Sequence, residues 1–207
     1  MLHFRHFHKS YGRHTVLSIE SKTISPGIYW VKGTNGSGKS TLLKSIAGFL
    51  FFEGEIHLNN ISLKKNSVTY RKIVNFADAE PVFPDFMTGR EMIDLFVKAK
   101  GGPRGQETYF IESMRMAPYL NEPLGTYSSG MLKKLSLLLA FLGNPTLILL
   151  DEPLITIDTE SLSVLYDWIR LMEREQKTTF LLSSHQALDP YALAGAKELF
   201  VKDQTLS

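Results

Sequence analysis

Residues 33–41 read GTNGSGKST, and this stretch decides how the rest of the chain is organised. Gly33, Gly38, Lys39 and Ser40 match G-x-x-x-x-G-K-[ST], a loop whose backbone N–H groups surround the phosphates of a nucleotide. Its glycines permit positive φ and close backbone approach, so that successive amides can converge on a polyanion. Lys39 adds a positive charge for the β- and γ-phosphates, and the Ser40 hydroxyl is a hard oxygen ligand for Mg²⁺. We therefore expect nucleotide binding by Gly33, Thr34, Asn35, Gly36, Ser37, Gly38, Lys39, Ser40 and Thr41.

The segments on both sides of this loop have the composition that the motif requires. Residues 28–32 read IYWVK, which is aromatic and β-branched like a buried strand. Residues 39 to about 49 carry apolar side chains at the spacing of one helix face, and the positive end of that helix would face the phosphates. A chance match in a glycine turn would not come with a strand before it and a helix after it, so the sequence favours nucleotide binding.

The composition limits the class of protein. A chain of 207 residues that is 43% hydrophobic can bury one substantial core, and we expect a single domain, residues 1–207. There is no cysteine, which favours a reducing compartment. The longest apolar run, residues 135–142, is far shorter than the roughly 20 residues of a membrane-spanning helix. Residues 1–11 also lack the apolar stretch of a secretory signal, so we expect a cytoplasmic protein.

The charge pattern gives no indication of a nucleic-acid partner. The net charge is +2, which is too small to predict binding to a polyanionic chain. We interpret the lysine pairs at residues 64–65 and 133–134 as solvated surface.

The first residues predict two strands, residues 2–8 and 16–24. His3, His6 and His8 are close enough in sequence to suggest a metal site, but no carboxylate or cysteine completes a ligand set, and an ordinary strand is favoured. Tyr11 precedes a glycine at the turn between the strands. It is either a core aromatic or a platform for a purine ring, and the sequence leaves both open.

The next part of the chain predicts strands at residues 54–58 and 73–77, followed by an irregular loop. Pro81 and Pro84 interrupt regular structure, yet the same loop carries Val82, Phe83 and Phe86. Apolar residues on such a loop are either packed beneath it or presented to a partner.

A helical lobe is expected after this loop. Thr88 and Glu91 have the spacing of a capping box, which predicts a helix at residues 89–99, and a second short helix follows at residues 107–116. Residues 84–126 are thus all-helical, and the helix expected at residues 127–143 extends the lobe, so that about residues 84–143 are inserted into the α/β core.

Acidic residues follow a short buried strand at residues 147–150. Ligands of an open α/β sheet collect at the carboxyl ends of its strands, so Asp151 and Glu152 should face the phosphate loop. Neighbouring residues point in different directions, which lets Asp151 reach a metal while Glu152 reaches a water molecule. A helix at residues 160–175 and a last core strand, residues 178–184, lead to His185 at a second strand end.

The set of motifs resembles the ATP-binding subunit of an ABC transporter over about residues 2–200. GTNGSGKST is similar to the phosphate loop of that family, and LILLDEP, residues 147–153, to its second nucleotide motif. YSSGM, residues 127–131, lies where the family has the signature LSGGQ. The resemblance implies an α/β fold with a phosphate-loop NTPase core of the ABC ATPase type, an N-terminal antiparallel β portion and an inserted α-helical lobe.

The resemblance also implies roles for individual residues. It assigns catalysis to Glu152, His185 and Lys39, and adenine stacking to Tyr11. It assigns the metal to Ser40 and Asp151, and contact with a second subunit to Asp158. The signature residues that would reach the ATP of the other subunit are Ser128, Ser129 and Gly130.

Two departures from the family pattern stand out. The signature has Tyr127, Ser129 and Met131 where the family has Leu, Gly and Gln, but it keeps the serine and the glycine that contact phosphate, so we expect it to work. The family also has a glutamine two residues before a proline, where this chain has Ala79 between Asp78 and Glu80. Either an acidic neighbour replaces the glutamine, or the alignment is off by one, or the coupling is altered.

The resemblance implies ATP and Mg²⁺ as cofactors and a head-to-tail dimer, either a homodimer or a paralogous heterodimer. Closure on ATP and opening after hydrolysis would drive a separate integral membrane permease from the cytoplasmic face of the membrane. The alternatives are a soluble ATPase of the same superfamily that acts on ribosomes or DNA, and a nucleotide-binding regulator that does not hydrolyse ATP.

Overall fold

The computed structural model describes residues 1–185 and 191–207 of the chain. In chain order its elements are β1 (Leu2–Tyr11), β2 (His14–Ile24), β3 (Ile28–Lys32), α1 (Lys39–Ile46), β4 (Glu53–Leu58), β5 (Ile61–Ser62), α2 (Ser67–Ile73), β6 (Val74–Ala77), α3 (Gly89–Lys100), α4 (Gln106–Ser113), η1 (Ala117–Tyr119), η2 (Leu124–Thr126), α5 (Ser129–Phe141), β7 (Leu147–Asp151), α6 (Thr159–Gln176), β8 (Thr179–Ser183), β9 (Lys197–Lys202) and β10 (Thr205–Leu206).

Within the described residues the strands form two sheets. The N-terminal sheet is antiparallel, in the order β2-β1-β4-β5, and the central sheet has the order β10-β9-β3-β8-β7-β6. In the central sheet β3 runs parallel to both β8 and β9, and β7 runs parallel to both β8 and β6. The carboxyl ends of β3, β7 and β8 therefore lie at one edge, where the loops that follow them meet.

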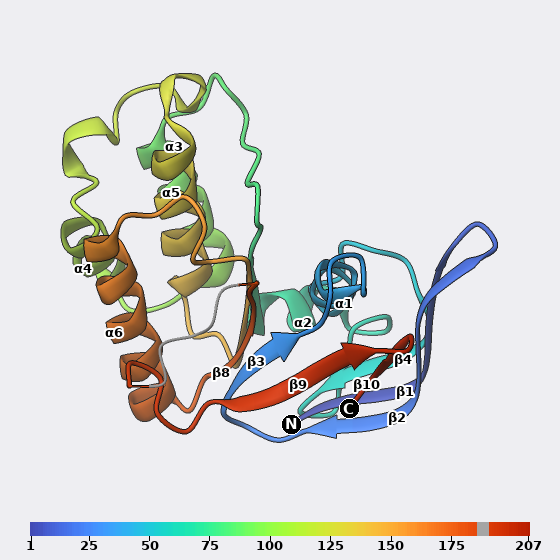
Figure 1. The fold of residues 1–207 in the computed structure, drawn as a ribbon. Helices are drawn as coiled ribbons and strands as arrows, with labels where there is room; N and C mark the ends of the chain where they lie inside the picture. The colour runs from blue at the N-terminus through green and yellow to red at the C-terminus, as the bar shows by residue number, and fades with distance from the viewer. Residues whose placement is uncertain (186–190) are drawn as a thin grey trace.

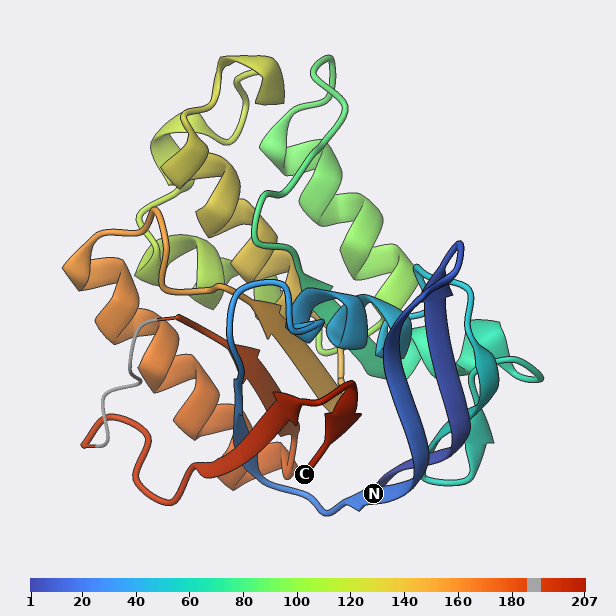
Figure 2. The ribbon, with the colours of Figure 1, turned by 45° about the vertical axis from the view of Figure 1, so that its right-hand side comes forward.

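The layers are stacked with the central sheet in the middle. Helices α3 to α6 lie on one side, and α1 and the antiparallel sheet lie on the other (Figures 1 and 2). Each face of the central sheet has its own hydrophobic cluster. Along β7, Leu147 and Leu149 pack into the cluster around α1, while Ile148 and Leu150 pack into the helical cluster. A strand buried on both faces needs apolar residues throughout, which explains the run that precedes Asp151.

Helix starts follow the capping signals of the sequence. At α3 the Thr88 side chain accepts from the Glu91 backbone amide, and the Glu91 carboxylate accepts from the Thr88 amide, so the predicted capping box is confirmed. At α5 the Ser128 hydroxyl accepts from the amide of Met131 at 3.2 Å. Within residues 1–185 and 191–207, no helix combines the length and apolar character that crossing a bilayer would take.

Three expectations about the elements were wrong. Ile73 ends the short helix α2, which was not predicted, so β6 begins at Val74. Residues 178–184 do not supply the last core strand, because β9 follows and pairs with β3. The lysine pair at residues 133–134 is not solvated surface, since Lys133 is fully buried at 0% exposure on the inner face of α5.

Candidate functional site

The phosphate loop connects β3 to α1, and its glycines are there for two different reasons. Gly38 has a φ of 105°, which favours glycine, and it closes the loop at the first turn of α1. At Gly33 the constraint is space, because an added Cβ would lie 2.6 Å from the Val201 carbonyl oxygen of β9. The loop thus rests directly on the neighbouring strand.

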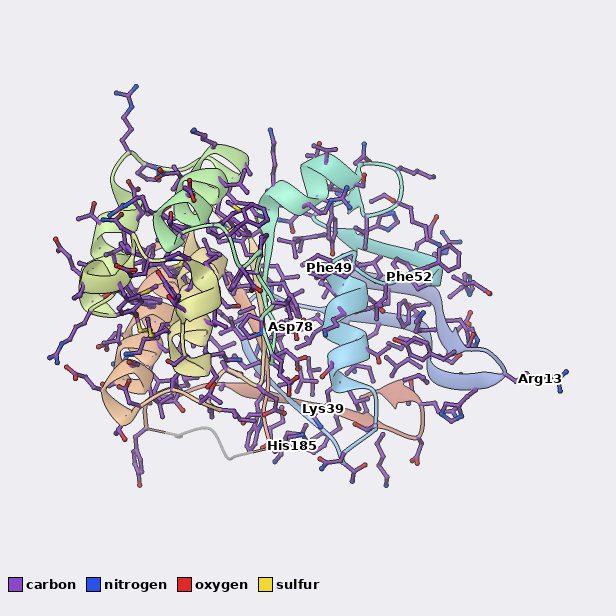
Figure 3. All side chains as sticks on the ribbon, turned by 90° about the horizontal axis from the view of Figure 1, so that it is seen from above. Arg13, Lys39, Phe49, Phe52, Asp78 and His185 are labelled. Atoms are coloured by element: carbon purple, nitrogen blue, oxygen red, sulfur yellow. The ribbon has the colours of Figure 1, made fainter. Side chains whose placement is uncertain are left out.

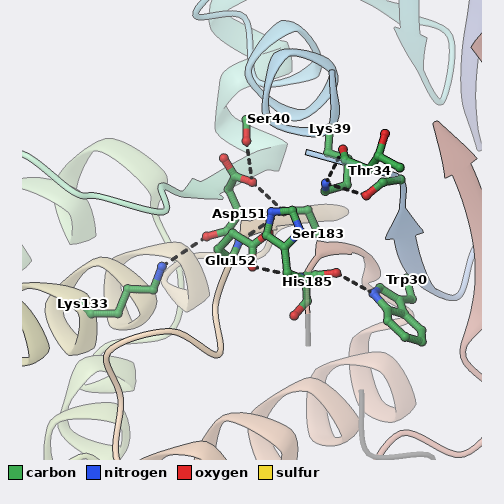
Figure 4. Close-up of polar contacts among 11 residues, drawn as sticks. Trp30, Thr34, Lys39, Ser40, Lys133, Asp151, Glu152, Ser183 and His185 are labelled. Carbon is green, nitrogen blue, oxygen red and sulfur yellow. Dashed lines mark hydrogen bonds and ion pairs between the residues drawn. The ribbon is translucent and has the colours of Figure 1, made fainter. Parts of the chain in front are cut away.

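Lys39 lies inside this loop. Its Nζ donates to the carbonyl oxygens of Gly33 at 2.9 Å and of Thr34 at 3.2 Å (Figure 4). Burial lowers the pKa of Lys39, and the carboxylates of Glu152 and Asp151 oppose this shift. The ammonium is therefore placed among carbonyls from which it can turn to phosphate oxygens.

Asp151 ends β7 and has the features of a metal ligand. Its Oδ1 accepts from the Ser40 hydroxyl at 3.0 Å and from the Ser183 hydroxyl at 2.5 Å. Its Oδ2 is buried and has no hydrogen-bond partner among the residues that the structure describes. An unpaired buried carboxylate oxygen is costly unless another group binds it. Next to a serine hydroxyl at a phosphate loop, this donor set fits Mg²⁺.

Glu152 and His185 lie against each other at this edge. The Glu152 Oε1 is 3.2 Å from His185 Nε2, and its Oε2 accepts from the backbone amide of His185 at 3.2 Å (Figure 4). Glu152 is buried, whereas the His185 side chain is 45% exposed. Viewed from above, the labels of His185 and Lys39 lie on the same side of the molecule, and the close-up draws both residues around Glu152 (Figures 3 and 4). A buried carboxylate and an accessible imidazole thus face the phosphate loop.

The backbone of Glu152 is held in an unusual conformation. Its φ is 45°, in the left-handed region that costs about 1–2 kcal/mol for a residue with a side chain. Its amide donates to the carbonyl oxygen and the hydroxyl of Ser183 at 3.2 and 3.1 Å. The sequence analysis did not identify Ser183, although a hydroxyl residue at the end of a buried strand was a signal.

Lys133 was also missed. Its Nζ donates to the carbonyl oxygens of Asp78 at 2.9 Å, Ala79 at 3.2 Å and Asp151 at 3.2 Å. Burial lowers the pKa of Lys133 to about 8, although the carboxylates of Asp151, Asp78 and Glu152 favour its charged form. One side chain of α5 thus reaches both the end of β7 and the segment after β6.

The signature residues and Asp158 lie together, on exposed parts of the chain. Ser128 and Ser129 are exposed at the start of α5, and an added Cβ on Gly130 would lie 3.1 Å from the carbonyl oxygen of Thr156. Asp158 caps α6 and forms an ion pair of 2.9 Å with Lys134 on α5. The amide of Ser161 and the Lys134 ammonium hold the pKa of Asp158 well below its usual range.

Tyr11 and the segment after β6 complete the set of predicted residues. Tyr11 ends β1 and is 51% exposed, with the Lys9 ammonium 4.4 Å from its ring centroid, so it is no core aromatic. The Asp78 carboxylate pairs with Lys44 of α1 at 2.9 Å, and Glu80 is exposed. In the part of the chain that the structure describes, neither carboxylate forms a hydrogen bond or ion pair with Asp151 or Glu152.

Comparison with known proteins gives a consistent set of relatives. The family model described as ABC transporter matches residues 20–155. Cytochrome c biogenesis ATP-binding export protein CcmA of Legionella pneumophila is 35% identical over 163 residues, covering 78% of this chain and 80% of that protein. Retinal-specific phospholipid-transporting ATPase ABCA4 of Bos taurus is 29% identical over 185 residues, or 86% of this chain. This chain spans 8% of ABCA4 and 20% of ABC transporter A family member 1 of Dictyostelium discoideum.

Solved structures with the same fold include the ATP-binding subunit of an ABC transporter. It has a TM-score of 0.89 at 23% identity and covers 100% of this chain and 88% of its own. A dimeric structure of the ATP-binding cassette MJ0796, in a post-hydrolysis state with ADP and Pi, has a TM-score of 0.82 at 21% identity, covering 100% and 97%. The predicted fold class is confirmed.

Proposed function

This chain belongs to the ABC transporter family of ATPases, and from that premise we propose that it powers transport through a separate membrane permease. The observation that carries the proposal is the convergence at one sheet edge of the phosphate loop, the Ser40–Asp151 contact and the Glu152–His185 pair. The groups come from the loop after β3, the end of β7 and the end of β8, and each has the chemistry that one step of ATP hydrolysis needs.

Binding of ATP would use the loop from Gly33 to Thr41. The amides of the loop and the positive end of α1 would face the phosphate chain together. Lys39 would exchange its contacts with the Gly33 and Thr34 carbonyls for phosphate oxygens. Ser40 and Asp151 would hold Mg²⁺, which supplies charge neutralisation between the β- and γ-phosphates.

Hydrolysis would depend on Glu152 and His185. The Glu152 carboxylate would accept a proton from the attacking water or hold that water in line. The His185 imidazole is 3.2 Å from this carboxylate and is partly open to solvent, so it could contact the γ-phosphate and orient Glu152 at once. Neither group has to hold the adenine or the ribose, so both would affect the rate more than the affinity.

A second nucleotide-binding subunit would complete the site. Ser128, Ser129 and Gly130 are at the positive end of α5, a suitable position for a γ-phosphate presented by another subunit. Asp158 is tied to the same helix through Lys134, so signature and contact loop would move as one unit. The solved MJ0796 structure of this fold is a dimer, and we propose the same head-to-tail arrangement here, with like or paralogous subunits.

The permease would bind at the segment between β6 and α3, which runs alongside the helical lobe (Figure 2). Val82 and Phe86 are 91% and 85% exposed, whereas Phe83 is half-buried against the helical core. Exposed apolar side chains at such a position suit the apolar face of a helix from another chain. The protein would thus be peripheral on the cytoplasmic face of the membrane, with no nucleic-acid partner.

The test is recovery of the protein with membranes that contain its permease. Phe86→Asp is expected to release the protein into the soluble fraction while ATP affinity stays unchanged. Tyr109→Asp is a matched control, because Tyr109 is also an exposed aromatic but lies on α4. Membrane recovery of Phe86→Asp at the wild-type level would contradict the proposed surface, and sedimentation of the wild type with ribosomes or DNA would favour the soluble alternative.

A further inference from the structure

Lys133 is a fully buried lysine on α5 whose ammonium faces backbone oxygens. The three N–H donors of an ammonium match three carbonyl oxygens, those of Asp78, Ala79 and Asp151, at 2.9 to 3.2 Å. Filling this space does not require a lysine, because a leucine or methionine would pack there without desolvating a charge. The lysine is therefore explained by its carbonyl partners.

The first partner is the peptide between Asp151 and Glu152. The carbonyl oxygen of this peptide accepts from Lys133, and its amide donates to Ser183. Both ends of one peptide plane are thus fixed, and the plane precedes the residue whose φ is 45°. Because this peptide sets the direction of the Glu152 side chain, Lys133 acts on the carboxylate that would face the attacking water.

The second partner is the segment Asp78–Ala79. Its two carbonyls bind Lys133 of α5, while the Asp78 carboxylate binds Lys44 of α1 at 2.9 Å. Figure 3 shows Asp78 at the boundary between the helical lobe and the half of the molecule that contains α1. The segment that leads to the proposed permease surface is thus held from both sides.

We propose that Lys133 is a positioning residue for ATP hydrolysis, which holds the Asp151–Glu152 peptide and the Asp78–Ala79 segment in one fixed arrangement. The inference rests on the proposed role of Glu152. Lys133 is on the same helix as the signature residues. A movement of α5 would therefore displace the Asp151–Glu152 peptide, and with it the Glu152 carboxylate, through the Lys133 side chain. Ala79 has no polar side chain that could reach the nucleotide site. Its backbone carbonyl oxygen is instead linked to the end of β7 through Lys133.

The experiment compares Lys133→Met with Lys100→Met and Glu152→Gln in the purified protein. Lys100 is a matched control, because its Nζ is also held by backbone carbonyls, those of Arg71 and Val74, far in sequence from Asp151. Lys133→Met is expected to lower kcat by roughly 10- to 100-fold, since small displacements of a catalytic group have effects of that order. Its affinity for a fluorescent ATP analogue, measured without Mg²⁺, should stay within about twofold, because the hydrogen bonds of Lys133 go to Asp78, Ala79 and Asp151 and not to the phosphate loop.

The outcomes separate positioning from stability. Lys100→Met should lose thermal stability to a similar degree yet keep kcat within about twofold. Equal losses of kcat in both methionine variants, or wild-type kcat in Lys133→Met, overturn the inference. If Lys133→Met does not fold, Lys133→Gln, which is uncharged and shorter, is assayed in the same way, and wild-type kcat there also overturns it. Normal turnover by Glu152→Gln would instead refute the proposed role of Glu152.

Discussion

The hydroxyl of Ser40 and the carboxylate of Asp151 meet across 3.0 Å, although 111 positions separate them in the chain. The contact links the first turn of α1 to the end of β7, which are brought together because β3 and β7 lie on either side of β8. The other oxygen of Asp151 is buried without a partner among the described residues. This carboxylate oxygen is therefore available to a third group, such as a metal ion.

Asp151→Asn removes the charge but keeps the shape of the side chain. We expect Mg²⁺ to raise ATP affinity in the wild type and to lose at least about tenfold of that effect in the variant, because a carboxylate ligand contributes most of its binding through charge. ATP titrations with Mg²⁺ and with EDTA measure the difference. Asp167→Asn, at an exposed carboxylate on α6, is the control. An unchanged Mg²⁺ effect in Asp151→Asn would show that the metal binds elsewhere.

Glu152→Gln keeps the hydrogen-bonding shape of the side chain but removes the proton acceptor. A positioned acid or base contributes roughly 10²- to 10⁴-fold, so turnover should fall by that order while ATP still binds. In the proposed dimer the γ-phosphate would remain intact between the subunits, so the variant should accumulate as an ATP-bound dimer. Size-exclusion chromatography with ATP and a turnover assay test both points. Near-normal turnover would refute the assignment.

His185→Ala should reduce the hydrolysis rate and spare ATP affinity. The imidazole contacts Glu152 at 3.2 Å, and His185 makes no hydrogen bond to the phosphate loop among the contacts that the structure describes. Single-turnover rates with saturating ATP, together with equilibrium binding, separate the two quantities. The predicted role is wrong if affinity falls while the rate per bound ATP stays the same.

Tyr11→Ala should weaken ATP binding by one to two decades, because stacking of a base on an aromatic ring contributes about 1–3 kcal/mol. Tyr11 is exposed, so the loss of its ring should leave the core intact. Tyr11→Phe and Tyr11→Trp keep a stacking face and should restore the affinity. The measurement is ATP titration of the four proteins, and equal affinities for all of them would rule out stacking.

The parts of the fold that depend on local signals were predictable from the sequence. The strand before the phosphate loop, the capping box of α3 and the apolar run of β7 each have a pattern that few other structures share. Helix α2 has no such pattern. Tyr70 alone among its residues is buried, so it has no apolar face, and no side chain caps its start. In strand β9 the burial alternates, with Leu199 and Val201 buried, but the exposed Phe200 between them is also apolar, so the sequence has no clear two-residue period.

Lys133, which the sequence analysis did not identify, can be recognised as a site residue only from tertiary structure. Residues 133, 137 and 140 share one face of a helix by their spacing, and that face is apolar apart from the lysine. The spacing could have shown that Lys133 points inward. It could not have shown that the chain after β6 and the end of β7 place carbonyl oxygens around the ammonium, because those contacts join positions 54 and 18 residues away.

The position of β3 between β8 and β9 affects how the protein forms during synthesis. The phosphate loop ends at Thr41, but the strands that flank β3 begin only at Thr179 and Lys197. At 5–20 residues per second, the ribosome needs on the order of 10 s to reach them. During that time the glycine loop has no neighbouring backbone to rest on. Nucleotide binding should therefore arise only after β8 and β9 have been made.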